Sequence, residues 1–474
     1  MPELPPKGSA FIDWYLAAVD AADLTDKRYP VKGMNVWTRY GILARRRLDR
    51  VMEDEIEATG SEPVEFPALI PETEFRKEGD HIKGFDAQVY WVTRGGATPL
   101  DVPLVLRPTS ETAMYPMFKL WVRSHQDLPL NLYQIVNTFR YETKTTRPFL
   151  RVREIHFFEE HSCQVDEAKA TERVQSNLGA FAKMAERFRL PYLAIRRPEW
   201  DKFPGAYYSI ALDIPVGGAR TLQIGSIHHY RENFSRPYEI QYEAPDGASR
   251  YVHQTTFGLS ERLVGAIVAV HGDDRGIAFS SDIAPYQVVV VPVPSAKGAD
   301  PTPYAREAAA ELSAAGLRVH IDERGDRPGA KFYYWETRGV PLRLDIGPRE
   351  AAAAQVSAVN RLGARSTLAR AGLAASVRSA LELYDRALGE RALAAFHASV
   401  ARADRLDDLP GSTAVRLLGW CGREECGHAI EQKIDGALLG TIEGVPPIPL
   451  DGPPPCIVCG TQAGALWAAA GQPL

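Results

Sequence analysis

Apolar residues recur every three or four positions in several stretches of the chain, which predicts amphipathic helices. One such stretch covers 36–59, and Gly60 is suited to end a helix there. A second covers 167–188, with Asp166 placed to accept a hydrogen bond from the first turn. A third apolar-periodic helix is expected over 259–270.

Shorter apolar runs separated by polar turns predict strands. The segment Val64–Pro71 has strand character and ends at a proline-marked turn. Residues 76–160 alternate short strands with polar turns, which favours an antiparallel sheet, and further strands are expected over 207–213 and 219–230.

The pattern of predicted elements changes near Pro285, where strands and helices begin to alternate. This alternation is typical of a parallel-type α/β domain over roughly 285–385. Its predicted elements, in order, are the strand Val288–Val291, the helix 303–315, the strand Leu317–Ile321, the helix Gly329–Arg338 and the strand Leu342–Ile346. The tail over 395–474 differs again, since it holds four of the five cysteines and suggests a small appended module.

Composition narrows the class of protein. The 474 residues are 45% hydrophobic and 24% charged, with a formal net charge of −5. Such a chain has no global positive field, so any contact with nucleic acid must use local basic surface. No apolar run approaches the roughly 20 residues that span a bilayer. Few, clustered cysteines argue against a disulfide framework and favour a cytoplasmic protein.

The segment 139–154 concentrates positive charge. It carries four arginines, Arg140, Arg147, Arg151 and Arg153, within 14 residues. A strand with Arg and Glu two residues apart is most often a solvated edge. Four neighbouring guanidinium groups repel one another, however, and they are best explained when a polyphosphate supplies the missing negative charge.

Two further polar segments accompany the arginines. The first is LRPTSET over 106–112, which by itself suggests a turn and a helix cap. The second is TFGLSER over 256–262, which opens the apolar helix. Its arginine, Arg262, is either solvent-facing or placed to cover a flat base or bind a terminal phosphate.

Four cysteines in the tail have the spacing of zinc ligands. Cys421 and Cys426 are separated by four residues, and Cys456 and Cys459 by two. Two such pairs about thirty residues apart predict a closed tetrahedral site for structural Zn²⁺, the alternative being four free buried thiols. Cys163 stands apart and is expected to be a small buried apolar residue.

Taken together, these segments resemble class II aminoacyl-tRNA synthetases, and in particular the proline–tRNA ligase family in its archaeal and eukaryotic form with a C-terminal extension. The shared motifs appear in family order over almost the whole chain, and FPALIPE over 66–72 is similar to the motif that builds the dimer interface. The others are HIKGF, WVTRGG, LRPTSET, FRYE, TRPFLR, HGDDRG and DRPGAKF.

The resemblance implies an α+β chain with three domains and a defined reaction. A class II antiparallel-sheet catalytic domain would cover 1–284, an α/β anticodon-binding domain 285–390, and a small zinc-binding α/β domain 391–474. The implied activity is attachment of proline to tRNA(Pro) through a prolyl-adenylate. The implied partners are ATP with Mg²⁺, proline, tRNA(Pro) and a second copy of the chain in a homodimer.

The resemblance also assigns roles to individual residues. Those implied for the amino acid are Thr109, Glu111, Phe157, Glu159, His161, Phe203 and His228. Those implied for ATP are Arg140, Glu142, Arg151, Gln223, Ser226 and Arg262, of which Arg140 and Arg262 are the implied catalytic pair. In the α/β domain, Phe332 would stack on the anticodon while Glu336 and Arg343 contact guanines. Without the resemblance, Glu336 is expected to be a solvent-facing helix residue.

Several positions differ from the family pattern, and they keep two other hypotheses open. Phe157 and Phe257 stand where the family has tryptophan, and Ile155 replaces an aromatic residue under adenine. A hydrophobic pocket discriminates one methylene by only ~1–3 kcal/mol, so a divergent paralogue would activate a proline analogue or resist an inhibitor. The other alternative is a non-catalytic RNA-binding protein, which the intact arginines argue against.

Overall fold

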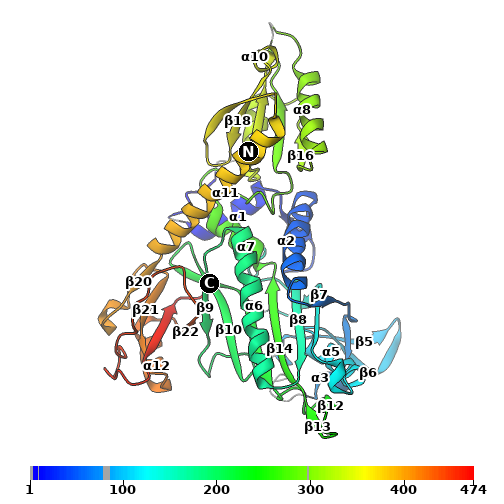
Figure 1. Cartoon of the computed structure of the whole chain (residues 1–474), viewed down its shortest axis with the longest axis vertical. Helices are drawn as coiled ribbons and strands as arrows, with labels where there is room; N and C mark the ends of the chain where they lie inside the picture. Colours follow the sequence, from blue (N-terminus) through cyan, green and yellow to red (C-terminus); the bar gives the residue numbers. More distant parts are fainter. Residues whose placement is uncertain (1–3, 9, 78–85, 143, 296–297) are drawn as a thin grey trace.

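The computed structural model describes residues 4–8, 10–77, 86–142, 144–295 and 298–474. The HIKGF motif at 81–85 lies outside these residues. Among the described helices, none is both long and apolar enough to cross a membrane. The molecule has a broad lower body and a smaller upper one, with the long helix α11 (Leu373–Ala398) running between them (Figure 1).

The lower body is built on an 11-stranded sheet with the order β20-β21-β23-β22-β9-β10-β11-β14-β8-β7-β3. Its central seven strands, from β22 to β7, are all antiparallel to their neighbours. These seven strands are β7 (Leu130–Phe139), β8 (Glu154–Gln164), β9 (Leu193–Arg196), β10 (Tyr208–Val216), β11 (Arg220–Arg231), β14 (His253–Ser260) and β22 (Ala437–Glu443), and β3 (Glu62–Pro63) lies at the edge.

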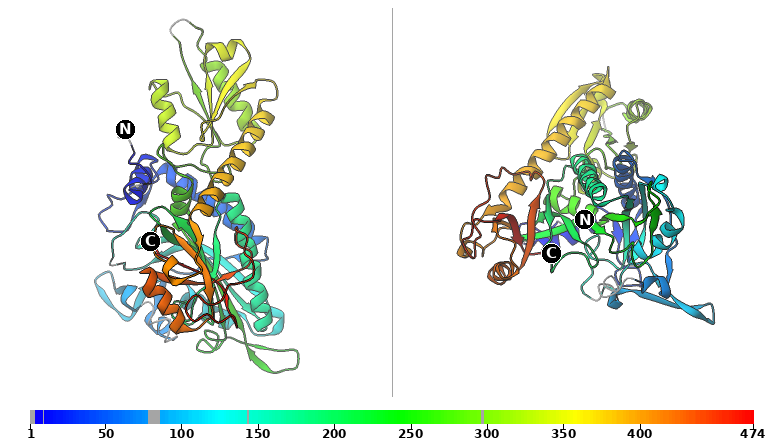
Figure 2. Two further views of the ribbon diagram at one scale, coloured as in Figure 1. Left: turned by 90° about the vertical axis from the view of Figure 1, so that its left-hand side faces the viewer. Right: turned by 60° about the horizontal axis from the view of Figure 1, so that its bottom comes forward.

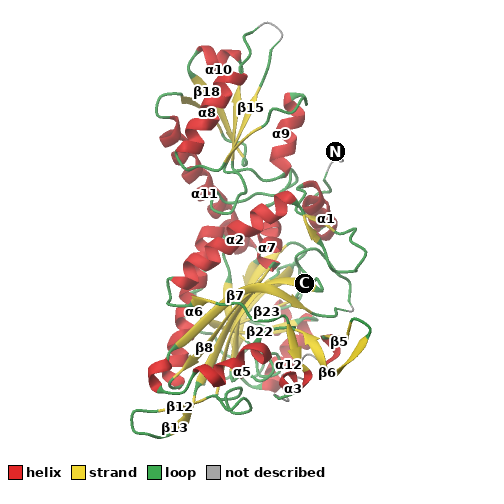
Figure 3. Cartoon of the chain, turned by 90° about the vertical axis from the view of Figure 1, so that its right-hand side faces the viewer, coloured by secondary structure: helices red, strands yellow, loops and turns green. Residues whose placement is uncertain are grey.

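Helices cover one face of this sheet, and one of them packs across β8, β14 and β11 (Figure 3). The helix α6 (Glu167–Phe188) has the predicted bounds, and the Asp166 side chain accepts a hydrogen bond from the backbone N–H of Lys169. Its apolar side packs into the largest core cluster together with the neighbouring helices. These neighbours are α1 (Phe11–Ala21), α2 (Arg39–Glu57) and α7 (Arg262–His271), beside the two-stranded pair β1 (Thr25–Asp26) and β2 (Val36–Trp37).

The strand expected over Val64–Pro71 is shorter than predicted. Only β4 (Leu69–Pro71) pairs within it, antiparallel to β6 (Thr98–Leu106). The backbone N–H of Phe66 donates to the side chain of Gln134 instead of to a strand, and the following proline has no N–H to donate. The rest of this subdomain comprises α3 (Glu72–Phe75), β5 (Tyr90–Gly95), α5 (Glu111–Trp121) and the hairpin β12 (Gln241–Glu243) and β13 (Ser249–Tyr251).

The upper body has a five-stranded sheet with the order β16-β15-β17-β18-β19. Its first three strands are parallel, as the alternation predicts, while β18 and β19 are antiparallel additions. Its elements are β15 (Val288–Pro292), α8 (Thr302–Ala314), β16 (Val319–Ile321), α9 (Pro328–Thr337), β17 (Leu342–Ile346), α10 (Pro348–Ala352), β18 (Gln355–Asn360) and β19 (Arg365–Ala369).

The C-terminal strands extend the sheet of the lower body, because β22 pairs with β9 along Glu443 to Thr441. The segment therefore lies side by side with strands about 240 residues earlier in the chain, as Figure 2 also shows. It comprises β20 (Val400–Arg402), β21 (Val415–Trp420), α12 (Glu424–Ile434), β22 (Ala437–Glu443) and β23 (Leu466–Gly471).

Gly440 makes this junction possible, which gives a first prediction. Its φ is +125°, and a Cβ at this position would lie 2.0 Å from the carbonyl oxygen of Arg196. We expect Gly440→Ala to reduce the free energy of unfolding by at least about 2 kcal/mol, from strain and overpacking. Calorimetric melting measures this loss.

A matched glycine controls for the substitution itself. Gly179 lies inside α6 with nothing within 4 Å of an added Cβ. Gly179→Ala is expected to raise stability by about 0.5–1 kcal/mol, the usual gain for alanine over glycine in a helix. Equal melting temperatures for the two variants would contradict the proposed role of Gly440.

Candidate active site

The strand β8 carries polar side chains on one face because residues two apart point to the same side of a strand. Phe157, Glu159 and His161 therefore face a common cavity. The intervening Glu160 points to the other side of the sheet and pairs there with Arg173 of α6, at 3.0 Å. The alternation therefore places the cavity-facing residues on one side of the sheet and a buried ion pair on the other.

Glu159 is a buried carboxylate with several donors around it. The backbone N–H of Ser110 donates to Glu159 Oε2 at 3.1 Å, and Gln134 Nε2 donates to Oε1 at 3.0 Å. The Ser110 hydroxyl makes a further hydrogen bond to the same carboxylate. The side chain is only 2% exposed. A carboxylate with this many fixed partners is held in a single orientation.

Glu111 is held in a similar way at the first residue of α5. It accepts hydrogen bonds from Thr109 Oγ1 at 2.6 Å and from the hydroxyl of Tyr230 at 2.8 Å. Thr256 Oγ1 donates in turn to the Tyr230 hydroxyl at 3.1 Å. A carboxylate in the first helical turn is also favoured by the helix dipole. Two buried carboxylates thus mark one end of the cavity as a site for a cation.

His161 lies between these acidic groups, with its Nε2 3.2 Å from Glu159 Oε2 and its Nδ1 3.3 Å from the hydroxyl of Tyr115. Burial by itself lowers the pKa of His161, but the hydrogen bond to Glu159 and the charge of Glu111 more than offset this, so the pKa is raised. The site therefore favours the protonated imidazole.

Aromatic side chains form the wall next to the carboxylates. The rings of Phe203 and His228 are stacked with centroids 4.5 Å apart. His228 Nδ1 lies 2.8 Å from Ser209 Oγ, and burial lowers the pKa of His228 to about 4, so this imidazole is neutral at pH 7. The ring of Phe157 lies against Gly258, where a Cβ would come within 2.9 Å of it. These groups suit a compact ring with apolar edges.

Three guanidinium groups, those of Arg140, Arg151 and Arg262, also line the cavity. Arg262 opens α7 and donates to the carbonyl oxygens of Leu150 at 2.9 Å and Gln223 at 3.3 Å. Burial, followed by repulsion from Arg140 and Arg151, lowers the pKa of Arg262 to about 10. All three side chains line one cleft. A polyanion bound there would relieve the repulsion.

Glu142 completes the arginine cluster, with its carboxylate 3.5 Å from Arg151 Nη1. The family resemblance assigned thirteen residues to the binding of the amino acid and of ATP. All thirteen line a single cavity of about 390 Å³. The cavity therefore combines buried carboxylates and an aromatic wall with a cluster of guanidinium groups. This arrangement matches a small ammonium-bearing molecule placed beside a phosphate chain.

The three residues assigned to the anticodon lie in the upper body, away from this cavity. The guanidinium of Arg343 lies 3.9 Å from the centroid of the Phe332 ring and also pairs with Asp345 at 2.8 Å. Phe332 lines a separate cavity of about 460 Å³. Glu336 accepts a hydrogen bond from Arg275 of the lower body at 2.8 Å. The structure therefore brings Phe332 and Arg343 together, while Glu336 links the two bodies.

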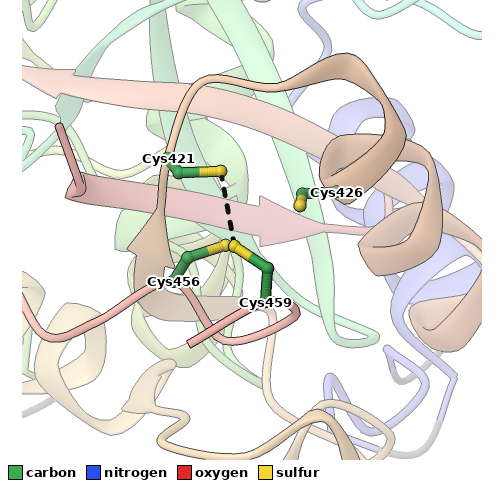
Figure 4. Close-up of side chains that lie close together, drawn as sticks. All are labelled: Cys421, Cys426, Cys456 and Cys459. Carbon is green, nitrogen blue, oxygen red and sulfur yellow. Dashed lines mark hydrogen bonds between the residues drawn. The ribbon is translucent and has the colours of Figure 1, made fainter. Parts of the chain in front are cut away.

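The four cysteines of the tail converge although they come from distant segments. Their sulfur atoms all lie within 4.8 Å of one another, and those of Cys421 and Cys459 are 3.9 Å apart (Figure 4). Tetrahedral zinc with bonds of about 2.3 Å to sulfur requires sulfur–sulfur distances near ~3.8 Å. The donor set therefore fits zinc. Cys163, by contrast, is a buried thiol inside β8, as expected.

The structure adds residues that sequence reasoning missed. Tyr230 orients Glu111, while Gln134 and Ser110 orient Glu159. Arg197 lines the cavity beside Gln223. These contacts join different strands and loops, and the spacing of residues along the sequence does not predict them. Among these residues, only Ser110 belongs to a motif that the sequence had singled out, LRPTSET.

Comparison with known proteins identifies the fold and the family. Residues 90–271 match the tRNA synthetase class II core domain (G, H, P, S and T), and residues 287–379 match an anticodon binding domain. The chain is thus a class II tRNA synthetase by fold and by the residues of its cavity. Proline–tRNA ligases of Thermococcus kodakarensis and Pyrococcus horikoshii are 48% and 46% identical to it, each alignment covering 96% of both chains. The chain belongs to the proline–tRNA ligase family.

Solved structures agree with this assignment. A Giardia lamblia prolyl-tRNA synthetase in complex with prolyl-adenylate superposes with a TM-score of 0.94 at 31% identity, covering 100% of both chains. A Cryptosporidium parvum prolyl-tRNA synthetase complexed with L-proline and AMP gives a TM-score of 0.90 at 26% identity, covering 100% of this chain and 97% of that one.

The environment of His161 gives a second prediction. Glu159→Gln removes the charge nearest the imidazole, so the pKa of His161 should fall. NMR titration of histidine-labelled protein, with His161→Gln to assign the signal, measures it. Glu142→Gln, at the opposite end of the cavity, should leave this pKa unchanged.

The sign of the effect on stability follows from the raised pKa. The native state holds the His161 proton more tightly than the unfolded chain does. This stabilising contribution is fully present below the unfolded pKa of about 6.5 and disappears as pH rises through the folded pKa. Glu159→Gln should therefore lose more stability relative to the wild type at pH 6 than at pH 9, and the opposite trend would refute the coupling.

Proposed function

We propose that this chain attaches proline to tRNA(Pro) in two steps, through a prolyl-adenylate. The observation that carries the proposal is the shared cavity, in which Arg140, Arg151 and Arg262 repel one another opposite two buried carboxylates. One end suits a triphosphate and the other a secondary ammonium. Family membership and the prolyl-adenylate bound to the Giardia lamblia relative support the same substrates.

In the first step, Glu111 and Glu159 hold the ammonium of proline while Phe157, Phe203 and His228 enclose its ring, with Thr109 and His161 beside them. The proline carboxylate forms a bond to the α-phosphorus of ATP, and the bond to pyrophosphate breaks. Arg140 lies at the α-phosphate, Arg151 at the outer phosphates and Arg262 over the adenine. Positioning and charge neutralisation supply the rate, without a general base.

The remaining nucleotide contacts come from Glu142, near the adenine amino group, and from Gln223 and Ser226 on β11. Mg²⁺ accompanies ATP and neutralises part of the phosphate charge. In the second step a ribose hydroxyl of the terminal adenosine of tRNA attacks the adenylate carbonyl, and AMP leaves. The arginine cluster then serves to hold the leaving phosphate in place.

We further propose that Phe332, Glu336 and Arg343 contact the anticodon. Support comes from the arrangement of Arg343 over the Phe332 ring beside a cavity, which offers a stacking surface and a guanidinium fork for a guanine. Glu336 is engaged by Arg275, so a guanine that binds Glu336 must share or replace that partner.

The division into a catalytic domain over 1–284, an anticodon-binding domain over 285–390 and a zinc-binding domain over 391–474 belongs to the same proposal. A homodimer is supported by apolar side chains exposed on α5 and on the small sheet of β4, β5 and β6. They are Leu69, Trp91, Val102, Met117, Leu120 and Trp121. The five free thiols favour a reducing, cytoplasmic location.

The central experiment measures proline-dependent exchange of pyrophosphate into ATP and aminoacylation of tRNA with a proline anticodon. We expect both activities, with proline preferred over its ring analogues. Removing Arg262 by Arg262→Met should lower the exchange rate by about 10²–10³-fold, the usual loss for one preorganised charge partner. Robust exchange with an analogue but not with proline would identify the divergent paralogue instead.

The control for this variant is Arg220→Met. Arg220 begins β11, the strand that also carries Gln223, but it is exposed and does not line the cavity. Its loss should change the exchange rate by less than about twofold, as for surface substitutions generally. An equal loss in both variants would refute the proposed role of Arg262.

We also propose that Cys421, Cys426, Cys456 and Cys459 bind one structural Zn²⁺. The convergence of four sulfur donors supports this site, and four thiolates leave no position for a water or a substrate. We expect one zinc per chain by atomic emission, and Cys456→Ser should lose the metal and lower the melting temperature. Cys163→Ser should retain the zinc, whereas zinc-free wild-type protein with full thermal stability would refute the site.

A further inference from the structure

Arg197 connects the cavity to the C-terminal strands. It directly follows β9, and its side chain is 8% exposed. Its Nη2 donates to Gln223 Oε1 at 3.1 Å and lies 2.9 Å from Asp213 Oδ2, and its Nη1 donates to the carbonyl oxygen of Leu439 at 3.0 Å. One buried guanidinium thus joins three strands, β10, β11 and β22.

The carbonyl of Leu439 is available because β22 has a bulge at this residue. Leu438 is opposite Ala470 and Gly440 is opposite Ala469, so Leu439 has no partner on β23. An extra residue of this kind leaves the regular ladder and can re-aim its groups. The φ of +125° at Gly440 belongs to the same distortion. The bulge presents its carbonyl to the guanidinium of Arg197.

The nucleotide end of β11 is fixed by the C-terminal segment at a second point. The backbone N–H of Thr221 donates to the carbonyl of Gln472 at 3.0 Å, and that of Leu474 donates to the carbonyl of Thr221 at 2.8 Å. Two residues further along, the carbonyl of Gln223 accepts from Arg262. The position of Gln223 therefore depends on contacts from the far end of the chain.

We propose that the C-terminal strands complete the nucleotide side of the cleft, with the Leu439 carbonyl fixing Arg197 and Arg197 acting as a positioning residue for Gln223. The inference rests on the proposed function, because it assigns the cleft to ATP. It gives the C-terminal segment a part in nucleotide binding besides that of carrying a metal site.

The neighbouring Arg196 provides the matched comparison. It also joins β9 to β22, through an ion pair with Glu443, and its guanidinium lies 4.2 Å from the Tyr208 ring centroid. Because adjacent strand residues point to opposite faces, Arg196 does not line the cavity. Its removal loosens the same junction without touching Gln223.

The test is the affinity of the full-length protein for the Mg²⁺ complex of AMPPNP, measured by titration calorimetry. We expect Arg197→Met to weaken nucleotide binding about 10- to 100-fold, because it loses a hydrogen bond to a charged group. The control variant Arg196→Met should change the affinity by less than about twofold. Unchanged affinity in Arg197→Met, or equal losses in both variants, would overturn the inference.

A double variant separates positioning from a direct charge effect. If Arg197 acts through Gln223, Gln223→Ala should weaken binding as much as Arg197→Met, and the combination should be no weaker than either single variant. Additive losses would show that Arg197 acts independently and would overturn the inference. Should Arg197→Met fail to fold, Arg197→Lys serves in its place, since one ammonium lacks the fork that reaches all three partners.

The nucleotide assay also distinguishes this inference from the proposed function. A wild-type protein that binds AMPPNP but forms no prolyl-adenylate would refute the proposed function, while the affinities of the Arg197 and Arg196 variants would still support or overturn the inference.

Discussion

The convergence of opposite charges in one cleft is the constraint on which the rest of the structure depends. Two buried carboxylates and three guanidinium groups line the same cavity. Burial lowers the pKa of Arg140, and the charges of Glu111 and Glu159 oppose that shift. Neither group is stable alone in a partly dry cavity, because buried charges cost free energy unless they are paired or hydrogen-bonded. The protein meets this cost at Glu111 and Glu159 with fixed donors, whereas burial, and after it repulsion from Arg140 and Arg151, lowers the pKa of Arg262.

The sheet sets the distances between the carboxylates and the guanidinium groups of the cleft. Glu159 and His161 lie on β8, Gln223 and His228 on β11, and Arg262 follows β14 at the start of α7. Since β8, β14 and β11 are adjacent in that order, their side chains face one cavity at fixed spacings. A rigid antiparallel sheet is well suited to hold two substrates in line, which is the main requirement of a reaction that depends on positioning.

The C-terminal segment is structurally continuous with the sheet that carries the site. It extends the catalytic sheet through β22 and reaches the cleft through Arg197. The anticodon-binding body is attached differently, by helix α11, by polar contacts such as that between Arg275 and Glu336, and by buried apolar residues such as Trp335 that share a core cluster with the lower body. The catalytic domain is thus joined to one neighbour by a continuous sheet and to the other by a helix and a contact surface that is both polar and apolar.

The sequence by itself determined the local features. The helix 167–188 and the strand Leu342–Ile346 follow from periodicity and capping, which are short-range properties of the chain. The spacing within each pair of cysteines also predicted that the four would converge. Resemblance of motifs indicated the family and the residues of the cavity. Tertiary structure alone decided the shorter strand at Leu69, the alignment of β22 with β9 and the contacts of Arg197. The last two join groups about 240 to 250 residues apart, and no local pattern predicts which distant donor or strand edge a group will contact.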